Sequence, residues 1–258
     1  MNTLARKRPQ DAEIPPNTLV YAVGDIHGRL DLLDRLIDWV AEDCRASRAD
    51  VARFIIFLGD YVDRGPSSKG VIDRLLSLSI PGLSVIALRG NHEQMMLDVL
   101  DAPDKGPGWA RVGGNATLMS YGVKPPAGGA DPAAWVEAVD ALRAAMPPSH
   151  VAFLRGLKPG VEFGDFFFVH AGIRPGRPIH AQTEQDLLWI RERFLNHKGS
   201  FERVIVHGHS TDTAPMVNDY RIGVDTGAYA TGVLTCLRLD GRDRMLFGVK
   251  LGGVGLWS

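Results

Sequence analysis

The sequence has few cysteines, little net charge and no long apolar run, and each absence excludes a class of protein. Its two cysteines, Cys44 and Cys236, cannot build a disulfide framework and have no metal-binding spacing. Both are therefore interpreted as small apolar core residues in a reducing compartment, and a cytoplasmic protein is expected. The formal net charge of −1 gives no basic field that would favour nucleic acid or an anionic membrane as a partner.

No stretch approaches the ~20 apolar residues that a membrane-spanning helix needs, so no membrane association is expected. Residues 1–17 are predicted to be a flexible N-terminal tail. Arg6, Lys7 and Arg8 lie in that tail, but no apolar run follows them as it would in a signal peptide. Residues 18–258 are expected to form a single domain.

One pattern occurs three times in the first hundred residues. An apolar run is followed by a polar loop and then by apolar residues at helical spacing, with the runs at Thr18–Val23, 53–58 and 83–88. Repeated strand–loop–helix units predict an α/β fold with a largely parallel sheet.

The middle of the chain has a different composition. Residues 101–164 are rich in proline and glycine and contain a helical pattern at 133–145, so we expect a helical and loop insert there. Further strands are then predicted at 165–169, 203–206, 220–224, 232–239 and 245–249. Short turns separate the last three, which predicts an antiparallel meander.

Polar side chains follow five of the predicted strands directly. The five segments are Gly24-Asp25-Ile26-His27-Gly28, Gly59-Asp60-Tyr61-Val62-Asp63-Arg64-Gly65, Gly90-Asn91-His92-Glu93, His170-Ala171-Gly172 and His207-Gly208-His209. Ligands bind at the carboxyl ends of strands in open α/β sheets, so these side chains are predicted to meet at one sheet edge. Asp, His and Asn together suit divalent ions such as Mn²⁺, Fe²⁺ or Zn²⁺.

Each segment is weak when it is taken alone. Asp25 or Asp60 would be an ordinary turn or helix-cap residue, and His170 an ordinary core histidine. Arg64 or Arg191 would be a solvated surface charge. What favours a metal site is their conjunction at five strand ends.

The series Asp25-x-His27, Gly59-Asp60-x-x-Asp63-Arg64 and Gly90-Asn91-His92-Glu93 resembles the signature of the PPP serine/threonine protein phosphatases, within the calcineurin-like metallophosphoesterases. His170-Ala171-Gly172 and Gly208-His209-Ser210 match that family's later histidine motifs. The segment ending in Arg191 is similar to the one that carries a second phosphate-binding arginine. The resemblance implies a metallophosphoesterase β-sandwich flanked by helices in four layers, α/β/β/α, with a small helical cap segment.

The resemblance also implies residue roles. Two divalent ions are implied, with Mn²⁺ favoured and Fe or Zn as alternatives, and a water between them would attack phosphorus. The first ion would be held by Asp25, His27 and Asp60, and the second by Asp60, Asn91, His170 and His209. His92 would be the general acid, oriented by Asp63, while Arg64, Asn91 and Arg191 would bind phosphate. His207 is left as a structural residue or a neighbour of a ligand.

The function implied is a protein serine/threonine phosphatase that acts on a phosphoprotein or phosphopeptide. The alternative is a symmetrical bis(5'-nucleosyl)-tetraphosphatase that acts on dinucleoside polyphosphates. Asp63 directly before Arg64, together with Glu93, favours the protein phosphatase branch. An inactive phospho-binding module is disfavoured because Asp60 and His92 are both present. An unrelated nuclease or phosphodiesterase on the same metals is disfavoured because Arg64 and Arg191 suit a terminal phosphate.

Overall fold

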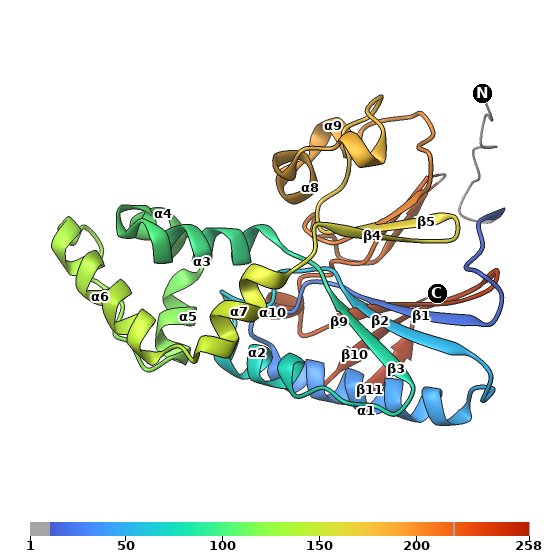
Figure 1. Ribbon diagram of the computed structural model, residues 1–258, viewed down its shortest axis with the longest axis horizontal. Helices are drawn as coiled ribbons and strands as arrows, with labels where there is room; N and C mark the ends of the chain where they lie inside the picture. Colours follow the sequence, from blue (N-terminus) through green and yellow to red (C-terminus); the bar gives the residue numbers. More distant parts are fainter. Residues whose placement is uncertain (1–10, 219, 258) are drawn as a thin grey trace.

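Two β-sheets packed face to face make up the centre of the protein (Figure 1). The computed structural model describes residues 11–218 and 220–257. The first sheet has the strand order β11-β10-β9-β1-β2-β3. Its strands are β1 (Thr18–Val23), β2 (Ala52–Phe57), β3 (Leu83–Ala87), β9 (Leu234–Asp240), β10 (Asp243–Lys250) and β11 (Gly253–Leu256). Strands β1, β2 and β3 pair in parallel, as the repeated pattern predicted.

The second sheet is built from the chain between the insert and the last hairpins. It has the order β4-β5-β6-β8-β7. Its strands are β4 (Gly160–Phe163), β5 (Phe166–Val169), β6 (Val204–His207), β7 (Met216–Asn218) and β8 (Arg221–Gly223). Strands β5, β6 and β8 run parallel to one another, so their carboxyl ends point the same way.

Some of the helices cover the outer faces of the two sheets, and others lie to one side of them. In chain order they are α1 (Leu30–Ala46), α2 (Ser68–Leu76), α3 (Asn91–Asp101), η2 (Pro103–Lys105), α4 (Gly106–Arg111), α5 (Gly114–Ser120), α6 (Pro132–Ala145), α7 (Pro148–Gly156), η3 (Ile179–Ala181), α8 (Glu184–Trp189), α9 (Glu192–Leu195) and α10 (Ala228–Thr231). Helices α1 and α2 lie against the first sheet, and α8 and α9 lie over the second (Figure 1).

The core between the sheets is apolar and closely packed. Val20 and Ile56 of the first sheet share one buried cluster with Phe168 and Val206 of the second. Each sheet buries one face against the other sheet and one face against helices. Most strands therefore carry apolar residues on both faces. The predicted α/β sandwich flanked by helices is confirmed.

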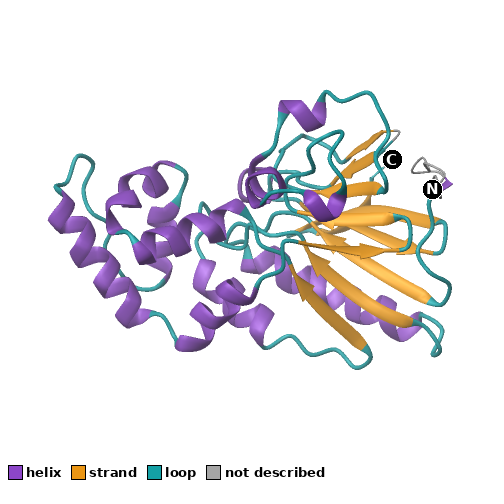
Figure 2. Cartoon of the chain, turned by 45° about the horizontal axis from the view of Figure 1, so that its top comes forward, coloured by secondary structure: helices purple, strands orange, loops and turns teal. Residues whose placement is uncertain are grey.

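The insert forms a helical arm that extends to one side of the sandwich (Figure 2). It contains α4, α5, α6 and α7, and the predicted helical pattern at 133–145 is α6. The last part of the predicted insert was misplaced, because Gly160–Phe163 is strand β4 and pairs with β5.

Two predictions about the sheets were wrong. The segment 220–224 was predicted to start a meander with the two strands that follow it, but β8 pairs with β6 in the second sheet. The meander is instead made of β9, β10 and β11, so its third strand lies in the glycine-rich end. The five site-bearing strands were also assigned to one sheet edge. They belong to two sheets. The sequence did not reveal this division because the strands of both sheets are apolar.

The predicted tail is also shorter than expected in the part that the structure describes. Ala12 and Ile14 are buried, and the Ile14 amide donates to the carbonyl of Gly241. Residues 1–10 of that prediction lie outside the described residues. None of the helices in the described part of the chain is long and apolar enough to cross a membrane.

Candidate metal centre

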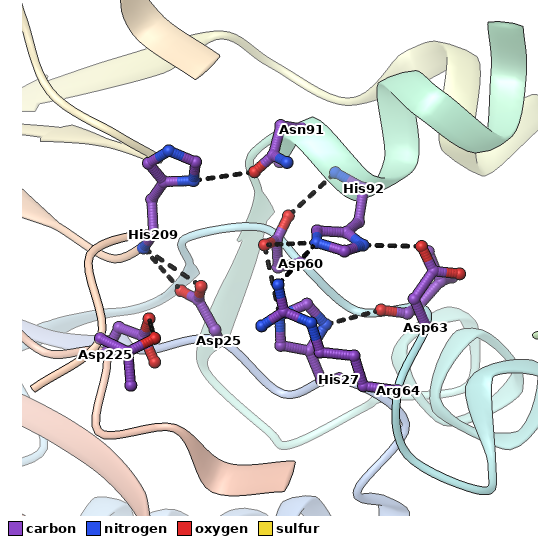
Figure 3. Close-up of polar contacts among 12 residues, drawn as sticks. Asp25, His27, Asp60, Asp63, Arg64, Asn91, His92, His209 and Asp225 are labelled. Atoms are coloured by element: carbon purple, nitrogen blue, oxygen red, sulfur yellow. Dashed lines mark hydrogen bonds and ion pairs between the residues drawn. The ribbon is translucent and has the colours of Figure 1, made fainter. Parts of the chain in front are cut away.

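The residues that follow the carboxyl ends of β1, β2, β5 and β6, with the start of α3 after β3, come together in one buried cluster. Figure 3 shows Asp25, Asp60, Asn91 and His209 of this cluster. The backbone there is unusual. The non-glycine residues with positive φ that flank these strand ends are His27, Asp60, Asp63, Arg64 and His209, with φ between 44° and 71°. Left-handed backbone at residues other than glycine costs free energy and persists where the surroundings enforce it, as at functional sites.

Asp60 lies at the centre of the buried polar residues. Its Oδ2 is 3.4 Å from Nε2 of His27, and its Oδ1 is 3.4 Å from Nε2 of His170. Two groups of possible ligand atoms share this carboxylate. One consists of His27, Asp60 and His92, and the other of Asp60, His170 and His209. A carboxylate common to two such groups suits a bridge between two cations.

The tautomers of His27 and His170 follow from their hydrogen bonds. Nδ1 of His27 lies 2.8 Å from the carbonyl of Val62, and Nδ1 of His170 lies 2.9 Å from the carbonyl of Leu58. A carbonyl only accepts, so each Nδ1 carries a hydrogen and each Nε2 has a free lone pair. Both lone pairs face Asp60, which places acceptor against acceptor. A divalent cation between them removes that conflict.

Asn91 adds a further oxygen to the second group. Its Oδ1 is 2.9 Å from Nε2 of His170 and 2.8 Å from Nδ1 of His209. The Nε2 atoms of His27 and His209 are buried without a hydrogen-bond partner among the described residues. Oxygen and imidazole donors gathered in this way fit Mn²⁺, Fe²⁺ or Zn²⁺.

Asp25 lies beside these groups and is not a member of either. Both of its carboxylate oxygens accept from the His209 amide, at 3.2 and 3.1 Å. Burial, together with Asp225 and Asp60, raises the pKa of Asp25 well above its usual range. A buried carboxylate beside two others is stabilised by a cation, so Asp25 can complete the coordination of an ion next to Asp60.

The charges at the centre are unequal. Burial alone would raise the pKa of Asp60, but the four histidines His170, His92, His27 and His209 outweigh it and lower the pKa. Burial lowers the pKa of His27 to about 3 and that of His209 to about 2. Asp60 is therefore an anion, and His27 and His209 beside it are neutral imidazoles, which is the protonation state that metal binding requires of each of them.

His92 differs from the other histidines because it has a second carboxylate. Its Nδ1 is 2.6 Å from Oδ2 of Asp63, and both side chains are buried. Burial opposes the charged form, but Asp60 and Asp63 together raise the pKa of His92 above its usual value. Arg64 extends one guanidinium nitrogen to within 3.2 Å of Nε2 of His92.

The second arginine lies on the other side of the centre. Arg191 donates from Nη1 to the carbonyl of His209, at 3.2 Å. The structure thus brings all the sequence-predicted site residues into one region. His207 belongs to neither ligand group. It packs against Phe194, with ring centroids 5.0 Å apart, and burial lowers its pKa to about 4.

The structural role of Glu93 was not predicted from the sequence. Its buried carboxylate accepts from the amides of Gly90, Asp60, Tyr61 and Val62 at 2.7 to 3.2 Å. Glu93 therefore fixes the loop that holds Asp60. Asp225 was also missed, although it follows the apolar segment 220–224 directly and the same strand-end rule would have found it.

Comparison with known proteins identifies the family. Residues 18–240 match the calcineurin-like phosphoesterase family. A serine/threonine-protein phosphatase 1 of Salmonella typhimurium is 29% identical over 86% of this chain and 92% of its own. A symmetrical bis(5'-nucleosyl)-tetraphosphatase of Methylococcus capsulatus is 26% identical over 85% of this chain and 65% of its own.

A solved structure of a candidate diadenosine tetraphosphatase shares the fold. Its TM-score is 0.61 at 19% identity, over 92% of this chain and 98% of the other. The fold, the paired ligand groups and these relatives agree on a hydrolase of phosphoric esters. The chain belongs to the calcineurin-like phosphoesterase family.

Proposed function

We propose that this protein is a metal-dependent phosphomonoester hydrolase that removes phosphate from phosphoserine and phosphothreonine in proteins. The observation that carries the proposal is the buried pair of His92 and Asp63, 2.6 Å apart, beside the shared carboxylate of Asp60. A protonated imidazole next to the reacting centre helps a poor leaving group such as a serine alkoxide to depart.

Two divalent ions, most suitably Mn²⁺, would be held by the strand-end residues. Asp25, His27 and Asp60 would hold one ion, and Asp60, Asn91, His170 and His209 the other. When bound, the ions supply an activated water and positive charge for the phosphoryl oxygens. The lone pairs of His27 and His170 that face Asp60 support this assignment.

The chain's own residues do the remaining work. Arg64 and Arg191 would grip the phosphoryl oxygens, with Asn91 close by, because a guanidinium forks onto two oxygens and keeps its charge. Arg64 now donates toward Nε2 of His92. Once Arg64 turns to the phosphate, Nε2 of His92 would carry a proton and pass it to the leaving oxygen. Asp63 keeps the other ring nitrogen protonated.

Protein substrates are favoured over dinucleotides for a chemical reason. A nucleoside diphosphate leaves easily, so its departure depends less on an acid than that of a serine alkoxide. The buried Asp63–His92 pair is therefore of most use with an alkyl phosphate ester. The near full-length similarity to the Salmonella phosphatase supports the same substrate class.

The second candidate is hydrolysis of dinucleoside tetraphosphates in the symmetrical manner. It is supported by the relative from Methylococcus capsulatus, which aligns with 85% of this chain. The same metals and arginines would serve that reaction, so the ligand groups do not separate the two candidates.

One preparation loaded with Mn²⁺ tests both candidates. We expect a larger kcat/KM for phosphoserine and phosphothreonine peptides than for diadenosine tetraphosphate. A tenfold or greater preference for the dinucleotide, ~1.4 kcal/mol of transition-state binding, would assign the protein to the second candidate. If the enzyme hydrolyses neither substrate, both candidates are rejected.

We also propose a cytoplasmic location. Cys44 and Cys236 are both free and buried, as suits a protein that folds in a reducing compartment. Fractionation of the native cells, followed by detection of the protein with an antibody, tests this location. Recovery of the protein from the periplasmic or secreted fraction would contradict it.

A further inference from the structure

The first part of the helical arm touches the candidate acid site directly. Helices α4 and α5 and the turn between them lie beside the loop that holds Asp63 and Arg64. From the sequence, this arm was expected to be a helical and loop insert that forms a small cap segment. Its contacts reach the side chains behind the acid, so it has a second possible role.

Two side chains of the arm bind the carboxylate of Asp63. The indole Nε1 of Trp109 donates to Oδ2 at 2.9 Å, and the hydroxyl of Thr117 donates to Oδ1 at 2.6 Å. Oδ2 is the same oxygen that faces Nδ1 of His92. Trp109 is 2% exposed and Thr117 is fully buried. The orientation of Asp63 toward His92 is thus set from the arm.

The arm also holds the strained backbone of this loop. Asp63 and Arg64 have φ values of 71° and 67°. The Asp63 amide donates to the Thr117 hydroxyl at 2.9 Å, and the Arg64 amide donates to the carbonyl of Gly113 at 3.2 Å. Because left-handed backbone needs support from its surroundings, these two bonds help to keep both side chains pointed into the site.

Glycine allows the close approach of the arm. A Cβ on Gly113 would lie 2.7 Å from Cγ of Arg64, and a Cβ on Gly114 would lie 2.3 Å from the Trp109 ring. Neither position has room for a side chain. The Gly113-Gly114 pair therefore brings the arm against Arg64 and seats the indole of Trp109.

We infer that Trp109 and Thr117 are positioning residues for the acid, so that the arm is a working part of the active site. The inference rests on the proposed role of His92. Trp109 and Thr117 each donate to one oxygen of the Asp63 carboxylate, whose Oδ2 faces Nδ1 of His92. Without these two donors, the Asp63 carboxylate can rotate away from Nδ1 of His92. Nε2 of His92 is then no longer directed at the leaving oxygen.

The test uses Trp109→Phe and Thr117→Val, with Thr117→Ser as the conservative replacement that restores a hydroxyl. Trp257→Phe is the matched control, because it also removes an indole donor. That donor bonds to Thr235 and not to Asp63. Each variant is assayed with a phosphoserine peptide and with p-nitrophenyl phosphate, whose leaving group needs little protonation. Bound metal and thermal unfolding are measured on the same preparations.

We expect Trp109→Phe and Thr117→Val to lose about 10-fold in kcat on the phosphopeptide, the usual effect of removing an orienting partner. The aryl phosphate should lose much less, the metal content should not change, and Thr117→Ser should recover most of the rate. Equal losses on both substrates, or a loss of metal, would assign Trp109 and Thr117 a structural role only and overturn the inference.

A second readout does not use activity. In the metal-free protein, Asp63→Asn should shift the indole N–H resonance of Trp109 and leave that of Trp257 in place. An unmoved Trp109 resonance would contradict the inference. If His92→Asn has the effect expected of an acid while the Trp109 and Thr117 variants do not, the proposed function stands and only this inference fails.

Discussion

The histidines around the Asp60 carboxylate fall into two groups whose pKa values shift in opposite directions. We call His27, His170 and His209 the ligand side, and His92 with Asp63 the acid side. On the ligand side, burial lowers the pKa of His27, His170 and His209. On the acid side, the pKa of His92 is raised, although it too is buried. All four rings lie near the same carboxylate, so their distance from Asp60 does not explain the difference.

The second carboxylate explains it. His27 and His170 direct Nδ1 at a backbone carbonyl, which fixes the tautomer and adds no full charge. His92 directs Nδ1 at Asp63, which is an anion when ionised and favours the protonated ring. A neutral ring with a free lone pair suits a metal, and a charged ring suits an acid. The partner of Nδ1 thus separates the two proposed roles.

Removal of the metals is the largest expected break in this comparison, because it destroys the ligand side alone. Chelation should reduce the rate more than about 10³-fold, since several kcal/mol of charge stabilisation is lost, and Mn²⁺ should restore it. Asp60→Asn should lower the bound metal as well as the rate, because the shared carboxylate becomes neutral. Metal analysis and initial rates on one preparation measure both effects.

A control for Asp60→Asn is available in Asp73→Asn, which removes a carboxylate bonded to Lys69 and His150 outside the centre. That variant should keep its metal and its rate. Full activity of the thoroughly chelated protein would contradict the metal assignment and with it the whole ligand side.

His92→Asn breaks the acid side and should leave the ligand side intact. We expect the rate on a phosphoserine peptide to fall ~10²–10⁴-fold, the usual contribution of a positioned acid. The loss should be smaller for an aryl phosphate, which leaves without much protonation. Two bound metals should remain, as measured by elemental analysis.

The alternative outcome is informative because His92 belongs to a ligand group with His27 and Asp60. If His92→Asn loses metal, and if the two substrates lose rate equally, then His92 is a ligand. The distinction between the two sides would then rest on Asp63 alone.

Much of this candidate site could be predicted from the sequence because each candidate ligand follows an apolar strand. Strands β1, β2 and β3 are apolar runs that end shortly before Asp25, Asp60 and Asn91, so the carboxyl end of each strand can be recognised in the sequence. The division into two sheets was not predictable in this way. Strands β5 and β6 are as fully buried as β1, so their composition does not say which sheet they join.

The supporting residues were hidden for a different reason. Trp109 and Thr117 lie in short helices of the arm, more than forty residues from Asp63, the residue that they hold. Their composition is that of ordinary core positions, and only the Gly113-Gly114 pair indicates a close approach. Contacts of this kind depend on the path of the arm, which no local pattern in the sequence fixes.

Tyr229 joins the two sides and gives the smallest effect. Its ring lies edge-on to His27 of the ligand side, with centroids 5.4 Å apart, while the Arg64 guanidinium lies 4.7 Å above it. Tyr229 is 40% exposed, so the cation–π contact with Arg64 is worth ~0.5–1 kcal/mol. Removal of the ring frees Arg64 and leaves the metals and the acid in place.

We therefore expect Tyr229→Leu to lower kcat/KM by about two- to fivefold, the rate equivalent of that contact. Tyr229→Phe keeps the ring face and should retain nearly the full value, because the contact needs no hydroxyl. Steady-state kinetics on a phosphopeptide, with metal content measured alongside, make the comparison. If Tyr229→Leu instead releases metal, the ring supports His27 more than Arg64, and Tyr229 belongs to the ligand side. If Tyr229→Phe is as impaired as Tyr229→Leu, the hydroxyl acts on the substrate and the cation–π explanation is wrong.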